Sequence, residues 1–222
     1  MSRRLTVLAV SVLVAVGVSA CGGGSSPATT PTPSSSGSAS NHPTSPTSSP
    51  KPPSSTAKTV APVPVENNPP GDIPDNLAFV GYTNKTGGYT FTHPEGWAQT
   101  GSGSRVRFTD KLNGVTVDSQ PASRAPTVAS ARSTEVPHLQ QAVPAFQLMS
   151  ISAVTVPAGR GVHIVFRRNS APDPVTGKVY RDEVEEYLVF SSGRQVRMDL
   201  YGPVGADNVD AYRTMSQSLQ IR

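Results

Sequence analysis

Between residue 76 and the end of the chain, apolar and polar residues alternate in short runs, which is typical of half-buried β-strands. This pattern predicts strands at Tyr89–His93, Arg105–Phe108, Val115–Val117, Leu148–Val156, Gly161–Arg168, Glu183–Phe190 and Gln195–Tyr201. Turn-forming residues separate the runs, and Asn113-Gly114 is the expected turn of one hairpin. Because short loops join consecutive strands, we expect the strands to pair antiparallel.

Two segments have a helical period instead. Apolar residues recur at helical spacing from Thr127 to Gln141, and Pro137 within it predicts one bent helix or two short ones. Near the C-terminus, Asp207 is a candidate N-cap of a final helix. The apolar stripe of that helix would be Val209, Tyr212, Met215 and Leu219. The pattern favours an α+β fold, an antiparallel sheet of about six or seven strands flanked by helices.

The N-terminal region has a different organisation. A basic start, Met1–Arg4, precedes the apolar run Leu5–Val18, and small residues follow up to Cys21. This order is typical of an export signal, and the run is shorter than the roughly 20 residues that cross a membrane. Residues 22–75 are rich in Gly, Ser, Thr and Pro, so they bury too little apolar surface to offset chain entropy.

We therefore predict a signal peptide at residues 1–20, a disordered linker at 21–75 that begins with Cys21, and one folded domain at 76–222. The linker is expected to act as a tether, or as a glycosylated stalk, because Ser/Thr-rich segments with Pro can carry O-linked sugars.

Val18-Ser19-Ala20-Cys21 resembles the lipobox of bacterial lipoproteins. The resemblance implies that the thiol of Cys21 carries a diacylglycerol and that the signal peptide is cut before this residue. It also implies acyl chains such as palmitate on the new N-terminus and an anchor in the outer face of the cell membrane. Arg3-Arg4 leaves the twin-arginine export route open beside the general secretory route.

The segment Gly88–Trp97, GYTFTHPEGW, resembles the opening signature of the PsbP-like fold. Asn169–Lys178 and Gly205–Asp210 resemble segments of actinobacterial, mycobacterial Lpq-type lipoproteins. These resemblances imply an antiparallel sheet flanked by helices over about residues 80–222. They point to no particular biochemical activity, and the photosynthetic and Ran-related roles of PsbP-like proteins do not carry over, because no functional residue of theirs matches here.

Composition excludes two classes of protein. Without residues 1–20, Lys and Arg number 17 against 15 Asp and Glu, too small an excess for a nucleic-acid-binding face. The single cysteine excludes an internal disulfide.

Candidate catalytic and metal-binding residues are few. The four histidines, His42, His93, His138 and His163, lie on separate predicted elements and lack the spacing of a metal site. Gly101–Ser104 lacks the strand–turn–helix context of a serine nucleophile and is expected to be a hairpin loop. We therefore expect no catalytic residue, no metal and no cofactor.

One acidic cluster stands out: Asp182, Glu183, Glu185 and Glu186. It fits a cation site or an acid–base pair. It fits better a set of cross-strand ion pairs with Arg167 and Arg168 on the preceding strand, which is the interpretation that we prefer. Glu186 shares a side of its strand with Val184 and Leu188, so if that side is buried Glu186 needs a partner such as an arginine.

These observations favour a lipid-anchored envelope protein with a non-enzymatic binding or scaffolding domain for a protein partner. Trp97 is expected in the core, and the loop Asn169–Lys178 is the candidate partner-contact region. The alternatives are a carrier or sensor of a hydrophobic small molecule or lipid, which needs an apolar cavity, and, behind it, a hydrolase.

Overall fold

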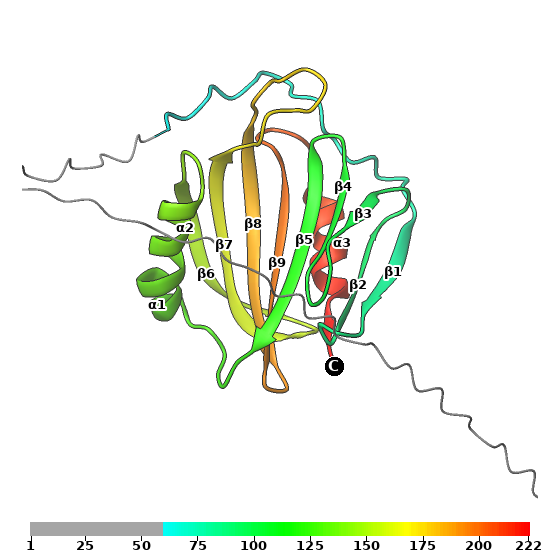
Figure 1. The fold of residues 1–222 in the computed structure, drawn as a ribbon, viewed down its shortest axis with the longest axis vertical. Helices are drawn as coiled ribbons and strands as arrows, with labels where there is room; N and C mark the ends of the chain where they lie inside the picture. Colours follow the sequence, from blue (N-terminus) through cyan, green and yellow to red (C-terminus); the bar gives the residue numbers. More distant parts are fainter. Residues whose placement is uncertain (1–59) are drawn as a thin grey trace, which may run out of the picture. The chain divides into compact units, whose positions relative to one another are not determined.

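Two antiparallel sheets organise residues 60–222, the part of the chain that the computed structural model describes (Figure 1). The large sheet has the strand order β3-β4-β5-β9-β8-β7-β6. Its strands are β3 (Ala98–Thr100), β4 (Val106–Asp110), β5 (Asn113–Pro121), β6 (Gln147–Val156), β7 (Gly159–Asn169), β8 (Arg181–Ser191) and β9 (Arg194–Pro203). The small sheet has the order β1-β2-β10, with β1 (Phe79–Asn84), β2 (Tyr89–Pro94) and β10 (Gln220–Ile221).

Helices flank the large sheet, so the predicted α+β fold is confirmed. The first helical stretch comprises α1 (Val128–Ser130), the π-helical segment η1 (Ala131–Glu135) and α2 (Val136–Ala142). Thr127 and Ser130 form a capping box at its start. Pro137 lies in the first turn of α2, where its missing N–H is tolerated, and the π-helical turn comes immediately before it. The last helix is α3 (Val209–Ser218).

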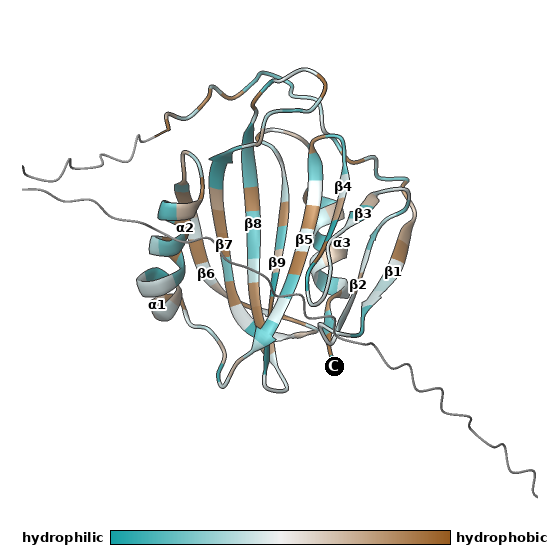
Figure 2. Cartoon of the chain, in the orientation of Figure 1, coloured by the Kyte–Doolittle hydropathy of each residue, from teal (hydrophilic) through white to brown (hydrophobic). Residues whose placement is uncertain are grey.

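The two faces of the large sheet are covered differently. On one face, here called the α3 face, α3 and the small sheet enclose an apolar core that includes Trp97, as predicted. On the other, the α2 face, the α1–α2 stretch packs on side chains of β7 and β8 such as Ile164 and Leu188. Figure 2 shows the alternation of hydrophobic and hydrophilic residues along these strands.

The Asn113-Gly114 hairpin turn was wrongly predicted. The turn between β4 and β5 lies at Lys111-Leu112, with Lys111 at a φ of 49°, and Asn113 and Gly114 already pair with Asp110 and Thr109. Gly114 is needed inside the strand, because a Cβ atom there would overlap the phenol group of Tyr201 on β9. The Asn-Gly pair that suggested a turn therefore contains a glycine, Gly114, that is needed to accommodate the ring of Tyr201.

Three further details differ from prediction. Asn208, and not Asp207, occupies the N-cap position of α3, and its side chain accepts from the N–H of Ile73 instead of capping the helix. Val209 is 60% exposed, so the buried stripe of α3 begins with Ala211 and Tyr212. The strands β1, β3 and β10 were not predicted, because two are very short and β1 lacks strict alternation.

Residues 60–75, which composition assigns to the linker, lie against the folded unit. Ile73 is buried in the core, the side-chain amide of Asn113 donates to the carbonyl of Gly71 at 2.7 Å, and Asn169 accepts from the N–H of Val63 at 3.0 Å. Polar side chains of the domain thus bind a backbone that has few partners of its own.

The predicted signal peptide, Cys21 and the first part of the linker lie outside the described residues. Within residues 60–222, no helix has the length and apolar character needed to span a bilayer.

Candidate functional site

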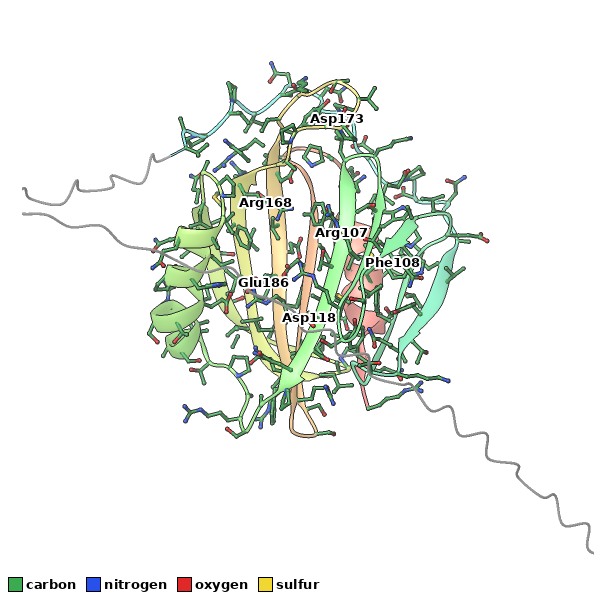
Figure 3. The ribbon with its side chains drawn as sticks, in the orientation of Figure 1. Arg107, Phe108, Asp118, Arg168, Asp173 and Glu186 are labelled. Carbon is green, nitrogen blue, oxygen red and sulfur yellow. The ribbon has the colours of Figure 1, made fainter. Side chains whose placement is uncertain are left out.

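A groove crosses the α2 face of the large sheet. The α1–α2 stretch packs on the β7 and β8 side, and the faces of β9, β5 and β4 beyond it line a hollow of about 720 Å³. A second hollow of about 360 Å³ continues it and shares six lining residues: Arg105, Thr116, Ala142, Val143, Arg168 and Asp199. We call the two together the groove. Figure 3 labels side chains that line it, from Asp173 near the top, through Arg168 and Arg107, to Asp118 below.

The floor of the groove is polar because strands alternate. On β9, Val196, Met198 and Leu200 are buried on the α3 face. The intervening residues therefore point to the α2 face: Arg197, Asp199 and Tyr201. A central strand normally carries apolar residues on both faces where both are covered. Here this polar side lies at the border of the α1–α2 stretch and lines the groove.

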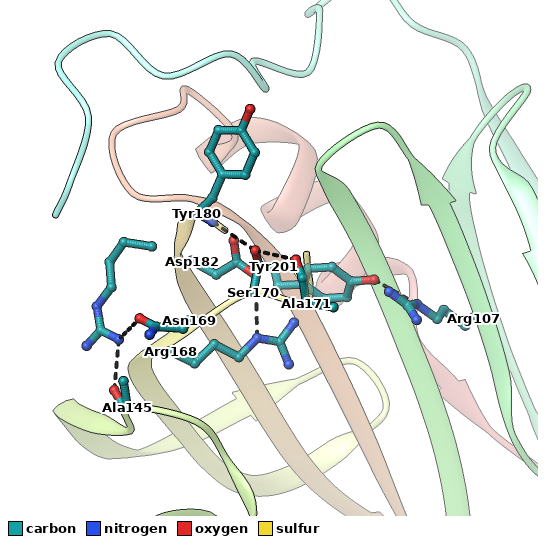
Figure 4. Close-up of polar contacts among 10 residues, drawn as sticks. Arg107, Ala145, Arg168, Asn169, Ser170, Ala171, Tyr180, Asp182 and Tyr201 are labelled. Carbon is teal, nitrogen blue, oxygen red and sulfur yellow. Dashed lines mark hydrogen bonds and ion pairs between the residues drawn. The ribbon is translucent and has the colours of Figure 1, made fainter. Parts of the chain in front are cut away.

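At the upper end of the groove, Tyr201 lies between two arginines (Figure 4). Arg107 Nε donates to the phenol oxygen at 2.8 Å, and the guanidinium carbon of Arg168 lies 4.7 Å from the ring centroid. Arg168 also pairs with the buried Asp182, Nε to Oδ2 at 3.5 Å. Burial raises the pKa of Asp182 to about 6, although Arg168 opposes the shift.

At the lower end, Arg197 connects the sheet with the helical stretch. Its Nη1 lies 3.1 Å from Glu186 Oε2 and its Nη2 lies 2.7 Å from Glu135 Oε1. Glu186 is completely buried, so the prediction that it needs an arginine partner is confirmed. Asp199 is directly opposite Glu186 in the β8–β9 register.

This carboxylate pair is poorly neutralised. Glu186 Oε1 and Asp199 Oδ1 are buried without a hydrogen-bond partner in residues 60–222. Burial, and then the charge of Asp199, raise the pKa of Glu186 well above its ordinary value. Burial raises the pKa of Asp199 to about 6, against the effect of Arg197. Both groups therefore hold protons more tightly in the folded protein than in the unfolded chain.

The acidic cluster predicted on β8 divides between the two faces of the sheet. Arg167 pairs with Glu183 at 3.0 Å and Arg168 with Asp182, which confirms the preferred cross-strand ion pairs. Glu185 points to the α3 face, where its Oε2 lies 3.1 Å from His163 Nε2. No group of three His, Cys, Asp or Glu residues with metal-binding geometry occurs within residues 60–222.

Of the histidines, His42 lies outside the described residues. His93 is buried and stacks on Phe108 with ring centroids 3.6 Å apart, and burial lowers its pKa. His138 is exposed, 3.8 Å from Glu135. His163 stacks on Tyr187, whose hydroxyl donates to the same oxygen of Glu185 at 2.9 Å.

No serine completes a nucleophile–base set with a histidine in this part of the chain. Gly101–Ser104 forms the β3–β4 hairpin loop, as predicted, and the Ser104 hydroxyl donates to Asp118 at 2.8 Å.

The loop Asn169–Lys178 connects β7 to β8 and borders the groove. It closes the β7–β8 hairpin, and its first residues form the upper wall of the groove. Asp173 Oδ1 accepts from the backbone N–H groups of Val175 and Thr176, which fixes the tip. Lys178 pairs with Glu66, so the loop also holds the incoming segment.

No family model matches the chain, and no curated protein matches it by sequence. Among solved structures, cyanobacterial PsbP (CyanoP) from Synechocystis sp. PCC 6803 is 16% identical, over 68% of this chain and 98% of that chain, with a TM-score of 0.45.

Two further structures are similar to the same extent. The Ran-binding protein Mog1p of Saccharomyces cerevisiae is 9% identical, over 65% of this chain and 96% of that chain, with a TM-score of 0.44. LpqN, involved in cell envelope biogenesis of Mycobacterium tuberculosis, is 13% identical, over 66% of this chain and 92% of that chain, with a TM-score of 0.40. At these identities the likeness concerns the fold alone.

Sequence analysis missed the residues that organise the groove, namely Arg107, Arg197, Asp199 and Tyr201. A signal for three of them is present on β9, where charged or polar residues alternate with Val196, Met198 and Leu200. Such alternation on a central strand indicates an uncovered sheet face. Arg107 alternates in the same way with Val106 and Phe108 on β4, but its contact with Tyr201 spans 94 residues of chain and has no local signal.

Proposed function

We propose that this chain is a non-enzymatic binding module that docks a partner protein in the groove. The observation that carries the proposal is the groove itself, an uncovered face of a central sheet that combines a charged floor with an apolar rim. Protein interfaces have this mixed composition, with arginine and tyrosine enriched among the residues that dominate affinity. The proposed docking site thus has a floor of strands, with the first residues of the loop Asn169–Lys178 as its upper wall.

Two other functions fit the groove less well. A carrier of a hydrophobic molecule needs an enclosed, mostly apolar cavity, whereas the groove opens to solvent over arginines and carboxylates. A hydrolase needs a nucleophile beside a base, whereas His163 and Glu185 lie on the α3 face, away from the groove.

The location that we propose is the outer face of the cell membrane, where a lipid on Cys21 would anchor the chain. This part of the proposal rests on the lipobox resemblance. Two or more acyl chains give a stable anchor, because each buried CH₂ contributes about 0.8 kcal/mol. Residues between the anchor and the domain would then act as the tether that lets the groove reach an envelope protein.

In-cell photo-crosslinking tests the docking function. A photoreactive residue replaces Thr109, which lines the groove, and in a separate control replaces Arg213, an exposed residue of α3 on the opposite face. We expect the same protein to be captured from the groove position and not from the control. Capture of lipid from the groove would favour the carrier instead, and equal capture from both positions would contradict a groove-specific partner.

A further inference from the structure

Tyr201 preorganises two arginines at the upper end of the groove. Its ring is buried, its hydroxyl accepts from Arg107 Nε at 2.8 Å, and the guanidinium of Arg168 stacks on it at 4.7 Å from the centroid. Both guanidinium groups are therefore held before a ligand arrives, so binding costs little further side-chain entropy. A planar guanidinium held this way matches the two oxygens of a carboxylate.

The backbone is adapted to this arrangement at Gly114. This residue lies directly opposite Tyr201 in the β5–β9 register, and a Cβ atom there would overlap the phenol group. Only glycine lets the ring cross β5 and reach Arg107 on β4. The position of the ring is thus a built feature of the sheet.

The charges at this end leave a cationic excess. Arg105, Arg107 and Lys111 have no carboxylate within 4.0 Å among residues 60–222. Three acids line the same hollow: Asp182 pairs with Arg168, Asp173 accepts hydrogen bonds from its own turn, and Asp199 also borders the lower hollow. An anionic group entering here meets arginines that have donors to spare.

The groove is long enough for a polypeptide segment. It borders β5 from Asn113 to Gln120, a distance of roughly 23 Å at about 3.3 Å per residue. An extended segment of about seven residues spans this length, whereas one small anion would leave most of the groove empty. Apolar residues along the rim, among them Leu112, Val143 and Pro172, can contact the stems of its side chains.

Resting on the docking function proposed above, we propose that the two arginines on Tyr201 bind a carboxylate of an acidic polypeptide segment, which lies extended along the groove. The segment has a defined direction. The lower hollow is lined by three acids, Asp118, Glu186 and Asp199, beside three arginines and so offers no excess of positive charge, which places the acidic residues of the partner at the Arg107 end.

Binding of a fluorescently labelled oligoglutamate of about seven residues to the full-length protein tests the inference. We expect Arg107→Gln to weaken binding about tenfold, because a charge-assisted hydrogen-bonded pair is lost. Tyr201→Phe keeps the ring but frees Arg107, and should weaken binding several-fold. Arg213→Gln removes the same charge from the opposite face and should leave binding almost unchanged. Arg107 is exposed, so its replacement should not alter the melting curve.

The outcomes separate the two proposals. Equal weakening by Arg107→Gln and Arg213→Gln would overturn the site, because only net charge would then matter. Inorganic phosphate that displaces the peptide at equal concentration would overturn the polypeptide part of the inference. If oligoglutamate does not bind while crosslinks from Thr109 still capture a protein, this inference fails and the docking function stands.

Discussion

Replacing Arg197 by methionine removes the guanidinium that neutralises the buried carboxylates of the groove. Glu186 is completely buried and Glu135 is mostly buried, and both contact Arg197. Breaking a buried ion pair by removing one partner costs about 3–5 kcal/mol, because the other charge remains without a partner. The Arg197 side chain is 30% exposed, so water moderates the cost. We therefore expect a loss of about 3 kcal/mol in the free energy of unfolding at about pH 7.5.

The loss of unfolding free energy caused by Arg197→Met should be larger at high pH than at low pH. The pKa values of Glu186 and Asp199 are raised in the folded state, to about 6 for Asp199. Such groups contribute stability that is complete below the unfolded pKa of about 4 and is lost as the pH rises through the folded pKa. Arg197 limits this loss by stabilising the ionised forms, so Arg197→Met should cost much less at about pH 5 than at about pH 7.5.

Urea denaturation, followed by the fluorescence of the single tryptophan Trp97, measures both effects. Adding Glu186→Gln to the Arg197→Met variant should recover part of the loss, because the unpaired charge is removed. Arg213→Met is the control, since its pair with Asp210 is exposed and contributes less than about 1 kcal/mol. A cost below about 1 kcal/mol for Arg197→Met at about pH 7.5, or an equal cost at both pH values, would refute the reasoning.

Trp97→Ala should cost about 3–5 kcal/mol, measured by circular dichroism during denaturation, and a loss below about 1 kcal/mol would place the indole outside the core. Gly114→Ala should cost about 1–3 kcal/mol because the ring of Tyr201 must move, whereas Gly81→Ala, with open space around it, should cost less than about 1 kcal/mol in the same assay. Cys21→Ala should abolish lipidation, and mass spectrometry that finds no lipid on wild-type Cys21 would contradict the anchor.

The sequence was sufficient for the elements of the fold that depend on local pattern. Alternation located the long strands β6 to β9 and, on β7 and β9, the residues that share a face, because the two-residue period of a strand is a local property. It also indicated that Glu186, if buried, would need a partner such as an arginine. The prediction of a turn at Asn113-Gly114 failed because the reason for the glycine lies elsewhere in the chain. Gly114 is required because a Cβ atom there would overlap Tyr201 on another strand.

The groove could not be predicted, because it depends on which strands become neighbours and on what covers them. Glu186 and Asp199 face each other only through the β8–β9 register, and Arg107 meets Tyr201 only because β5 joins β4 to β9. The α1–α2 stretch ends at Ala142, too short to cover a seven-stranded sheet, so the faces of β9, β5 and β4 beyond it stay open. Local sequence therefore specifies each strand and its two sides, while the packing of distant segments makes one of those sides a binding surface.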